Sequence, residues 1–312
     1  VCSSDLRAER GSGPSVAALL GNATAPQSNL DYGEFVVDRL LLDIDRLRAA
    51  LAPRWAHVDV VDETASTNAD LLAASSDSSA SAASAASAAS VAPDRSVLVA
   101  EHQTSGRGRF DRVWNSPPRA GLTFSVLLRP DVPLLLWGWL PLLAGVALAE
   151  AVRDTAGVET SLKWPNDLLA GPDGRKAAGI LVQTGGDAVV VGIGLNVSTT
   201  TDELPVETAT SLALQQATTL DRTDLLAAIL TRIDARVAQW TDCAGDAAAC
   251  GLAAAYRDLC GTIGAAVRVT VADSKTVEGQ AVDVDAGGRL VVRTPTGNQT
   301  IGAGDVEHLR LA

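Results

Sequence analysis

The sequence predicts an α+β fold in which a mixed β-sheet packed with helices precedes a small all-β unit, a compact barrel or sandwich. Two observations carry this prediction. Short β-branched and apolar runs alternate with amphipathic stretches as far as residue 262, and four short runs separated by Gly, Asp, Asn and Pro turns occupy the rest of the chain. With 47% hydrophobic residues among 312, the chain can bury a sizeable core.

Composition divides the chain into regions. Residues 1–34 are rich in Ser, Gly, Asn and Pro and contain no signal-peptide core, and the chain has no Met even at position 1. We therefore predict a disordered or non-native tail there. Residues 35–262 are predicted to form the larger domain, in which 75–92 is a low-complexity Ser/Ala insertion without large apolar residues. Residues 263–312 form the all-β unit.

The first elements follow from periodicity. Residues 35–51 repeat apolar side chains every three or four positions, which predicts an amphipathic helix. Residues 57–61 alternate as in a half-buried strand. Thr67 or Asn68 can cap a helix that begins near Ala69. This strand-to-helix junction leaves polar side chains available for a small ligand.

The apolar stretch 134–152 approaches membrane-spanning length. Pro141 suits the first turn of a helix, and the stretch ends among charged residues, Glu150, Arg153 and Asp154. We therefore predict a buried core helix and no membrane span.

The remaining elements are predicted in the same way. A short strand at 160–163 is followed by a turn at 171–174, strands at 179–183 and 188–197, and helices at 222–241 and 250–259. The all-β unit contains runs at 267–271, 276–284, 289–293 and 299–301.

A formal net charge of −12 argues against general affinity for nucleic acid or anionic membranes, which need a surplus of Lys and Arg. The four cysteines (Cys2, Cys243, Cys250 and Cys260) show no C-x-x-C spacing and are typical of reduced thiols in the cytoplasm. Only three histidines occur, widely separated, so neither a zinc site nor a Ser-His-Asp triad is predicted.

The segment 101–114, EHQTSGRGRFDRVW, lies between apolar runs at 96–100 and 122–128 and predicts a loop that joins adjacent strands. Glycines allow its backbone to approach a ligand, and arginines provide permanent positive charge. The loop therefore suits a carboxylate or phosphate. An isolated GRGR is equally compatible with a solvated hairpin tip. The glycines are Gly106 and Gly108, and the arginines are Arg107, Arg109 and Arg112.

Other polar groups occur at ends of predicted elements. Ser66 begins a run with Thr67 and Asn68, and Lys163 ends a short strand before a Trp-Pro-Asn-Asp turn that fixes its backbone. In the strand 188–197, Gly192 and Gly194 remove side chains along one face, so a flat ligand could lie there beside Asn196. For the glycines taken alone, close strand packing is the better explanation.

These groups include anion sites and an oriented lysine but no evident nucleophile or acid/base pair. Such a set favours catalysis by positioning and electrostatics. A carboxylate that attacks the α-phosphate of ATP needs both anions neutralised and aligned, which Arg and Lys donors provide. The product would be an acyl-adenylate.

At this point the motifs become specific. The segments STN, EHQTSGRGR followed by Trp114, KWPND, RKAAGIL and GIGLNV, in this order, resemble those of the biotin protein ligases, most closely the actinobacterial members. The resemblance runs from about residue 35 to the C-terminus. It implies a catalytic domain followed by an SH3-like β-barrel, and a two-step reaction. Biotin and MgATP give biotinoyl-5'-AMP, and a lysine of a biotin carboxyl carrier protein domain takes the biotinoyl group.

The resemblance also implies residue roles, with Lys163, Arg107 and Arg109 as catalytic residues. The ureido end of biotin would contact Ser66, Thr67, Asn68 and Gln103, and the carboxylate and phosphates would contact Gly106, Arg107, Gly108, Arg109, Arg112 and Lys163. The nucleotide would contact Asn166, Lys176 and Asn196. Trp114 would cover the adenylate, and Gly192 and Gly194 would line the site. No protein metal site is expected, and Mg²⁺ would arrive with ATP.

The chain departs from the family pattern in three places. Asp111 stands where the family often has Gly, which removes a permissive residue and adds a negative charge near the phosphate site. Ser105 replaces a usual Ala, and Gln183 a usual Glu. Some family members carry an N-terminal DNA-binding domain, for which too few residues precede 35, so no nucleic-acid partner is expected. We expect a monomer or weak homodimer.

Two alternatives remain. A lipoate or octanoate ligase or transferase of the same superfamily would share much of the catalytic domain, although KWPND, GRGR and a C-terminal barrel favour biotin. A non-catalytic anion- or nucleic-acid-binding module would use the arginine loop and the small barrel, but the acidic composition and the absence of stacking aromatics argue against it.

Overall fold

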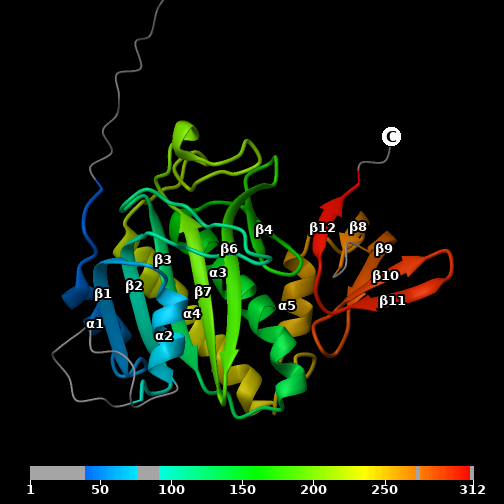
Figure 1. Ribbon diagram of the computed structural model, residues 1–312, viewed down its shortest axis with the longest axis horizontal. Coiled ribbons are helices and arrows are strands. Elements are labelled where there is room, and N and C mark those ends of the chain that lie inside the picture. Colours follow the sequence, from blue (N-terminus) through cyan, green and yellow to red (C-terminus); the bar gives the residue numbers. More distant parts are fainter. Residues whose placement is uncertain (1–38, 76–90, 272–274, 310–312) are drawn as a thin grey trace, which may run out of the picture. The chain divides into compact units, whose positions relative to one another are not determined.

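The computed structural model describes residues 39–75, 91–271 and 275–309 (Figure 1). The chain divides into two units, Val1–Asp38 and Arg39–Ala312. The predicted tail at 1–34 and most of the Ser/Ala tract, residues 76–90, lie outside the described residues.

A seven-stranded mixed sheet forms the larger domain. Its strand order is β1-β2-β3-β7-β6-β5-β4, in which β1 and β2 are parallel and the other neighbours antiparallel. The predicted mixed sheet is therefore confirmed. The strands are β1 (His57–Thr64), β2 (Ser96–Gln103), β3 (Gly121–Leu128), β4 (Thr160–Lys163), β5 (Asp167–Ala170), β6 (Arg175–Gly185) and β7 (Ala188–Asn196).

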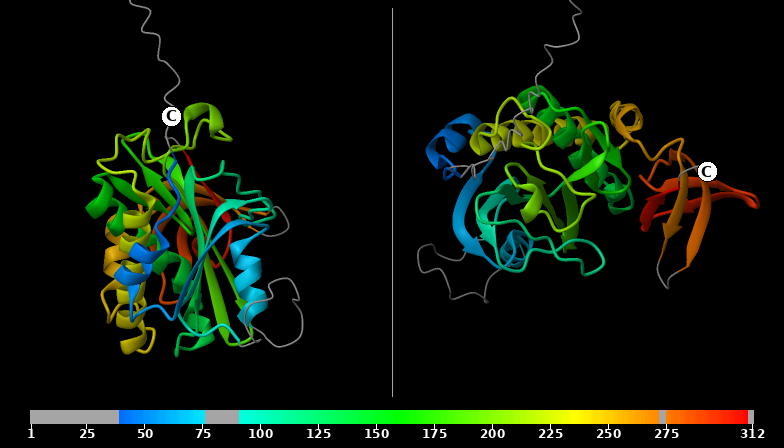
Figure 2. Two further views of the ribbon diagram at one scale, coloured as in Figure 1. Left: turned by 90° about the vertical axis from the view of Figure 1, so that its left-hand side faces the viewer. Right: turned by 90° about the horizontal axis from the view of Figure 1, so that it is seen from above.

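Helices cover both faces of this sheet. One face carries α2, which packs on β3 and β7, and the other carries α3 and α4, which also pack on each other (Figure 2). Buried Val and Leu side chains of β3 and β7 fill the space between sheet and helices. The helices are α1 (Ile44–Leu51), α2 (Thr67–Ser75), η1 (Leu134–Trp139), α3 (Leu140–Ala156), η2 (Thr201–Glu203), α4 (Arg222–Asp242) and α5 (Leu252–Leu259).

Helix α3 has the predicted core position. The stretch Leu134–Ala156 is long and apolar enough to cross a membrane by length and composition alone, but 67% of its apolar 18-residue window is buried inside the molecule. Pro141 stands in the first turn, where its missing N–H costs no hydrogen bond, and Gly157 ends the helix with a left-handed φ of 66°. The buried side chains face the sheet and α4, as expected for a core helix.

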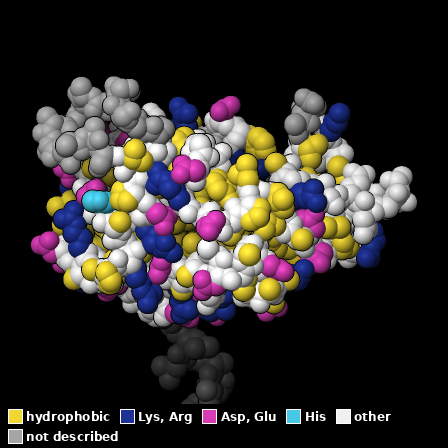
Figure 3. Space-filling view, turned by 90° about the horizontal axis from the view of Figure 1, so that it is seen from below, with side chains coloured by type: hydrophobic (Ala, Val, Ile, Leu, Met, Phe, Trp, Pro, Cys, Tyr) yellow, Lys and Arg dark blue, Asp and Glu magenta, His cyan; other side chains and the backbone are white. Residues whose placement is uncertain are grey.

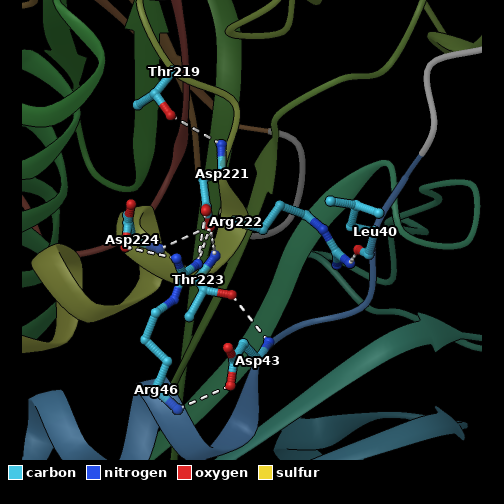
Figure 4. Close-up of polar contacts among 8 residues, drawn as sticks. All are labelled: Leu40, Asp43, Arg46, Thr219, Asp221, Arg222, Thr223 and Asp224. Atoms are coloured by element: carbon cyan, nitrogen blue, oxygen red, sulfur yellow. Dashed lines mark hydrogen bonds and ion pairs between the residues drawn. The ribbon is translucent and has the colours of Figure 1, made fainter.

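The prediction of one helix over residues 35–51 was wrong for 39–43, and 35–38 lie outside the described residues. Residues 39–43 are not helical because their backbone groups bond to distant side chains instead of one another. The Leu42 N–H donates to Glu101 Oε1 at 2.8 Å, and Arg222 Nη2 donates to the Leu40 carbonyl at 2.6 Å (Figure 4). Asp43 then caps α1 by accepting from the Arg46 N–H.

Several boundaries also differ from the prediction. α5 begins at Leu252, not at Cys250, and both β1 and β2 extend three residues beyond the predicted ends. These shifts are of the size by which helix and strand ends ordinarily vary.

The all-β unit has five strands where the sequence predicted four runs. Their antiparallel order is β11-β10-β9-β8-β12. The missed strand, β12, has four residues and pairs with β8, so its register is set by a partner some forty positions away. The strands are β8 (Ala266–Thr270), β9 (Thr276–Val284), β10 (Leu290–Thr294), β11 (Gly297–Ile301) and β12 (Asp305–His308).

On the face shown in Figure 3, the described acidic and basic side chains are interspersed, with apolar side chains between them. This distribution differs from the contiguous basic surface by which proteins bind nucleic-acid backbones.

Candidate functional site

A cavity of about 130 Å³ lies at one end of the seven-stranded sheet, where α2 begins and the segment 101–114 crosses. Thirteen of the sixteen predicted site residues line it: Ser66, Thr67, Asn68, Gln103, Arg107, Gly108, Arg109, Arg112, Trp114, Asn166, Lys176, Gly192 and Gly194. The structure thus brings together groups that are far apart in sequence. The volume is below the roughly 300–1,000 Å³ of ligand pockets, so a ligand must displace some of the lining.

Uncharged polar groups form one end of the cavity. The predicted cap was wrong: the helix begins at Thr67, and Ser66 caps it, accepting from the Ala69 N–H through its hydroxyl at 3.4 Å. Thr67 and Asn68 are consequently free to face the sheet. The Thr67 N–H donates to Gln103 Oε1 at 2.8 Å, and Asn68 Nδ2 donates to the Leu181 carbonyl at 3.1 Å.

The sequence analysis missed Ser125, which completes this polar end. Its hydroxyl donates to Asn68 Oδ1 at 2.6 Å and lies 2.7 Å from the Thr67 hydroxyl, at a fully buried position. One signal could have revealed it, because Ser125 interrupts the apolar residues of β3 between Phe124 and Val126. Gln183 also contributes, accepting from Asn68 Nδ2 at 2.9 Å. The amide and hydroxyl groups therefore form one network of donors and acceptors.

The sequence predicted that Gly192 and Gly194 of β7 leave one face of the strand open to a flat ligand, and the structure differs. Protein groups already cover this face, because a Cβ at Gly192 would overlap the Asn68 amide and a Cβ at Gly194 would overlap the Trp114 indole. The indole also lies against Gly179 of the neighbouring strand. The glycines thus admit the Trp114 ring, and a planar ligand would have to share this face with it.

Replacing Gly194 by alanine is expected to lower the free energy of unfolding by about 1–3 kcal/mol, because the added methyl overpacks the indole. The measurement is urea unfolding beside Gly302→Ala, where a Cβ meets only ordinary contacts and the change should stay within about 0.5 kcal/mol. Equal stability of the two variants would show that the indole does not lie over Gly194 in solution.

Residues 107–113, the arginine hairpin, fold back on themselves over the cavity. Arg107 and Val113 form an antiparallel bridge, and the Gly108 N–H donates to the Arg112 carbonyl at 2.6 Å. Phe110 and Asp111 at its tip have φ values of 53° and 56°. Two consecutive positive φ values are typical of a type I′ turn, in which Gly is favoured. Asp111 therefore occupies a left-handed position that a Gly would adopt without steric cost.

Positive charge forms the other end of the cavity. Lys176 Nζ lies 2.6 Å from Asp167 Oδ1, Arg109 Nη1 donates to Asn166 Oδ1 at 3.1 Å, and Arg112 pairs with Asp305. The Arg112 pair is half-exposed, and such pairs contribute only about 0–1 kcal/mol, so an incoming phosphate could replace Asp305 as its partner.

The electrostatic setting of the arginines differs within the hairpin. Burial lowers the pKa of Arg109, although Asp167 and Asp305 oppose this, and the guanidinium stays charged at any physiological pH. The hydrogen bond to Asp305 raises the pKa of Arg112. Arg109 is thus the less solvated cation, and it also contacts the face of Phe110 at 4.8 Å. Its charge is the one least screened by water.

Three predicted residues do not line this cavity. Gly106 packs against the Trp114 backbone, and Asn196 is buried with its Nδ2 donating to the Thr210 carbonyl at 2.9 Å. Lys163 lies at the end of β4 beside a narrow neighbouring pocket, whose lining it shares with Asn166 and Asp167. Because these two residues line both spaces, Lys163 lies next to the wall of the cavity.

A second cavity of about 270 Å³ adjoins the first. Its walls come from η1 and α3, from the turn after Lys163 and from the loops of the C-terminal sheet, and Arg109 and Asn166 line both cavities. The arginine hairpin is therefore bordered by space on two sides.

Comparison with known families gives two matches. A model described as "Biotin/lipoate A/B protein ligase family" matches residues 78–198, and one described as "Biotin protein ligase C terminal domain" matches residues 262–309. The second match covers the five-stranded sheet.

Similar proteins and structures agree with these matches. A biotin–[acetyl-CoA-carboxylase] ligase of Mycobacterium tuberculosis is 41% identical over 86% of this chain and all of that protein. One of Paracoccus denitrificans is 31% identical over 67% of this chain and 88% of that protein. A biotin protein ligase from Aquifex aeolicus, solved with biotin and ATP, has a TM-score of 0.64 at 27% identity and covers 82% of this chain and all of that one. The predicted α+β fold with an SH3-like C-terminal domain is confirmed.

Proposed function

The chain belongs to the biotin protein ligase family, and from that premise we propose that it activates biotin with ATP to biotinoyl-5'-AMP and transfers the biotinoyl group to a lysine of a biotin carboxyl carrier domain. The supporting observation is the polarity of the cavity. One end carries uncharged amides and hydroxyls around Asn68, and the other carries Arg107, Arg109, Arg112 and Lys176. A neutral ureido ring suits the first end, and carboxylate and phosphate groups suit the second.

In the proposed first step, the protein brings two anions together and forms no covalent bond to either. A biotin carboxylate oxygen attacks the α-phosphorus of ATP and pyrophosphate leaves. Arg107 and Arg109 would neutralise the carboxylate and phosphate oxygens, and Lys163 would join them from its neighbouring position. Lys176 and Asn166 would contact the nucleotide, and Trp114 would cover the adenylate.

Mg²⁺ belongs to the proposal as a companion of ATP. No group of three or more His, Cys, Asp or Glu side chains suited to a metal occurs in residues 39–75, 91–271 and 275–309. Mg²⁺ commonly takes one or two carboxylates together with substrate phosphates and water. Asp167 and Asp305, which line the cavity beside the cations, are the carboxylates that fit such an ion. The ion would offset charge on the phosphates.

The proposal is tested by incubating the purified chain with biotin and MgATP. Pyrophosphate release that depends on biotin, with biotinoyl-5'-AMP identified by mass spectrometry, is the expected result. Lipoate and octanoate are supplied in parallel, and they should give no more than a small fraction of the biotin rate, because they leave the donors and acceptors around Asn68 without partners. A folded protein that adenylates lipoate but not biotin would overturn the proposal in favour of the related ligases.

The proposed acceptor is the carrier domain of an acyl-CoA carboxylase, since the relatives from Mycobacterium tuberculosis and Paracoccus denitrificans are named for the acetyl-CoA carboxylase that they modify. We further propose a cytoplasmic enzyme that acts as a monomer or weak homodimer. Reduced thiols suit that compartment: Cys243, Cys250 and Cys260 carry no disulfide.

A further inference from the structure

A short hydrogen-bond chain connects the C-terminal domain to the turn that follows Lys163. The Trp164 N–H donates to Thr262 Oγ1 at 3.1 Å, and the same oxygen lies 3.0 Å from His308 Nε2. Thr262 is fully buried, and His308 is the last residue of β12. One threonine hydroxyl thus joins the backbone next to Lys163 to a histidine of the other sheet.

The backbone holds this threonine in place. The Gly261 N–H donates to the Leu162 carbonyl at 2.9 Å, and Cys260 and Leu162 form a parallel bridge. The segment before Thr262 therefore runs parallel to β4 and pairs with it at a single bridge. Thr262 cannot shift without disturbing the strand that carries Lys163.

The hydrogen bond from Trp164 leaves the hydrogen of the Thr262 hydroxyl available to His308. Thr262 Oγ1 accepts from the Trp164 N–H, so its own hydrogen can be given to His308 Nε2. This arrangement requires a neutral imidazole that is unprotonated at Nε2 and carries its hydrogen at Nδ1. If His308 Nε2 carried a proton, the buried Thr262 hydroxyl would lose this acceptor, and water does not reach it as a replacement.

The surrounding charges favour the same state. Burial and the positive charge of Lys163, in that order, lower the pKa of His308. On β8, the residue opposite His308 is the uncharged Val267. The charged groups beside it on β8 and β12 have their own partners: Glu307 pairs with Arg268, and Asp305 pairs with Arg112.

We propose that His308 is a positioning residue for the Lys163 turn. As a neutral acceptor it holds the Thr262 hydroxyl in the orientation that receives the Trp164 N–H, and it keeps a second positive charge away from the Lys163 ammonium. Protonation of His308 removes the acceptor for the Thr262 hydroxyl and places a second positive charge near Lys163. This inference rests on the proposed role of Lys163 in adenylate formation.

The lowered pKa of His308 determines how stability changes with pH. Because the folded pKa lies below the unfolded value of about 6.5, the unfolded chain binds this proton more readily. The contribution of His308 to stability is therefore complete above pH 6.5 and is lost as the pH falls through the folded pKa. Adenylate formation should show an acid limb at the same folded pKa.

The first test does not depend on activity. Nitrogen NMR of the imidazoles should show His308 neutral at pH 7 with Nε2 unprotonated, and the signal is assigned by its loss in His308→Gln. Lys163→Met should raise the His308 pKa, because a repelling charge is removed. A hydrogen on His308 Nε2 at pH 7, or a His308 pKa that is unchanged in Lys163→Met, would overturn the inference. This outcome does not depend on whether the substrate is biotin or lipoate.

The second test uses the rate of biotin-dependent pyrophosphate release between pH 5 and 8.5. His308→Ala should lower kcat by about 10- to 100-fold at neutral pH, as misplacement of a reacting group does, with little change in KM. His308→Gln keeps an acceptor that does not titrate, so it should restore most of the rate and abolish the acid limb. An acid limb that persists in His308→Gln, or a His308→Ala variant with the wild-type profile, would refute the positioning role. Absence of activity in the wild type at every pH would instead contradict the proposed function.

Discussion

Replacing Lys163 by alanine is expected to lower the rate of biotinoyl-5'-AMP formation by about 100- to 1,000-fold, the usual effect of removing one donor that stabilises developing negative charge. The attacking carboxylate and the α-phosphate repel each other, and the transition state concentrates charge between them. A lysine ammonium placed there lowers the barrier without forming a bond. The measurement is single-turnover adenylate formation with saturating biotin and MgATP.

The position of Lys163 supports this expectation, although its side chain lies beside the cavity and not in its lining. The residue ends β4, and the Asn166 N–H donates back to the Lys163 carbonyl at 3.2 Å, so the backbone turns sharply behind it. Asn166 accepts from Arg109 of the arginine hairpin at 3.1 Å. The Lys163 turn and the arginine hairpin are therefore directly connected, and a movement of the hairpin toward ligand would bring the two cations together.

Lys275 provides a matched control, since it is an exposed lysine in the hairpin between β8 and β9, away from the cavity. Lys275→Ala should keep the wild-type rate within about twofold, and both variants should unfold at similar urea concentrations because neither removes a buried group. If Lys163→Ala forms adenylate at nearly the wild-type rate, Lys163 is not a catalytic residue and Arg107 and Arg109 must provide the electrostatic stabilisation.

Local patterns were sufficient for much of this structure. Apolar, β-branched runs predicted β2 and β3, and the Gly-rich segment between them lies over the cavity as expected. Lys163 ends a strand, and the largely apolar α3 is a core helix. Each of these features depends on residues close together in sequence, so the spacing of apolar residues and the composition of turns were enough to predict them.

Features that depend on distant partners could not be predicted in the same way. Residues 39–43 have a helical pattern, yet they are not helical because Glu101 and Arg222 bind their backbone. Strand β12 exists through pairing with β8, and the Trp114 ring lies over Gly194 because the arginine hairpin folds back. In each case a tertiary contact outweighs a weak local preference.

Replacing Glu101 by alanine is expected to lower the free energy of unfolding by about 3–5 kcal/mol, because it leaves the Arg222 guanidinium buried without its counter-charge. Glu101 Oε2 lies 2.6 Å from Arg222 Nη1, and the two residues are 6% and 7% exposed. Arg222 also donates to the Gly121 carbonyl. Its contact with the Leu40 carbonyl, shown in Figure 4, connects α4 to the segment before α1. The measurement is equilibrium urea unfolding at neutral pH.

The control for this prediction is an exposed ion pair at the start of the same helix, α4. Arg46 pairs with Asp221 at 2.7 Å, but these side chains are 45% and 38% exposed, so Arg46→Ala should cost no more than about 1 kcal/mol. A loss from Glu101→Ala as small as that would show that water reaches the buried pair.

The double variant Glu101→Leu with Arg222→Met separates charge from packing. If the cost of the single change comes from an unpaired buried charge, removing both charges should recover most of the lost stability, since apolar replacements of buried ion pairs are often neutral or stabilising. The segment 39–43 would still lose the hydrogen bonds that hold its backbone, so some loss should remain. A double variant as unstable as the single one would mean that these backbone hydrogen bonds, and not the ion pair, account for the effect of Glu101.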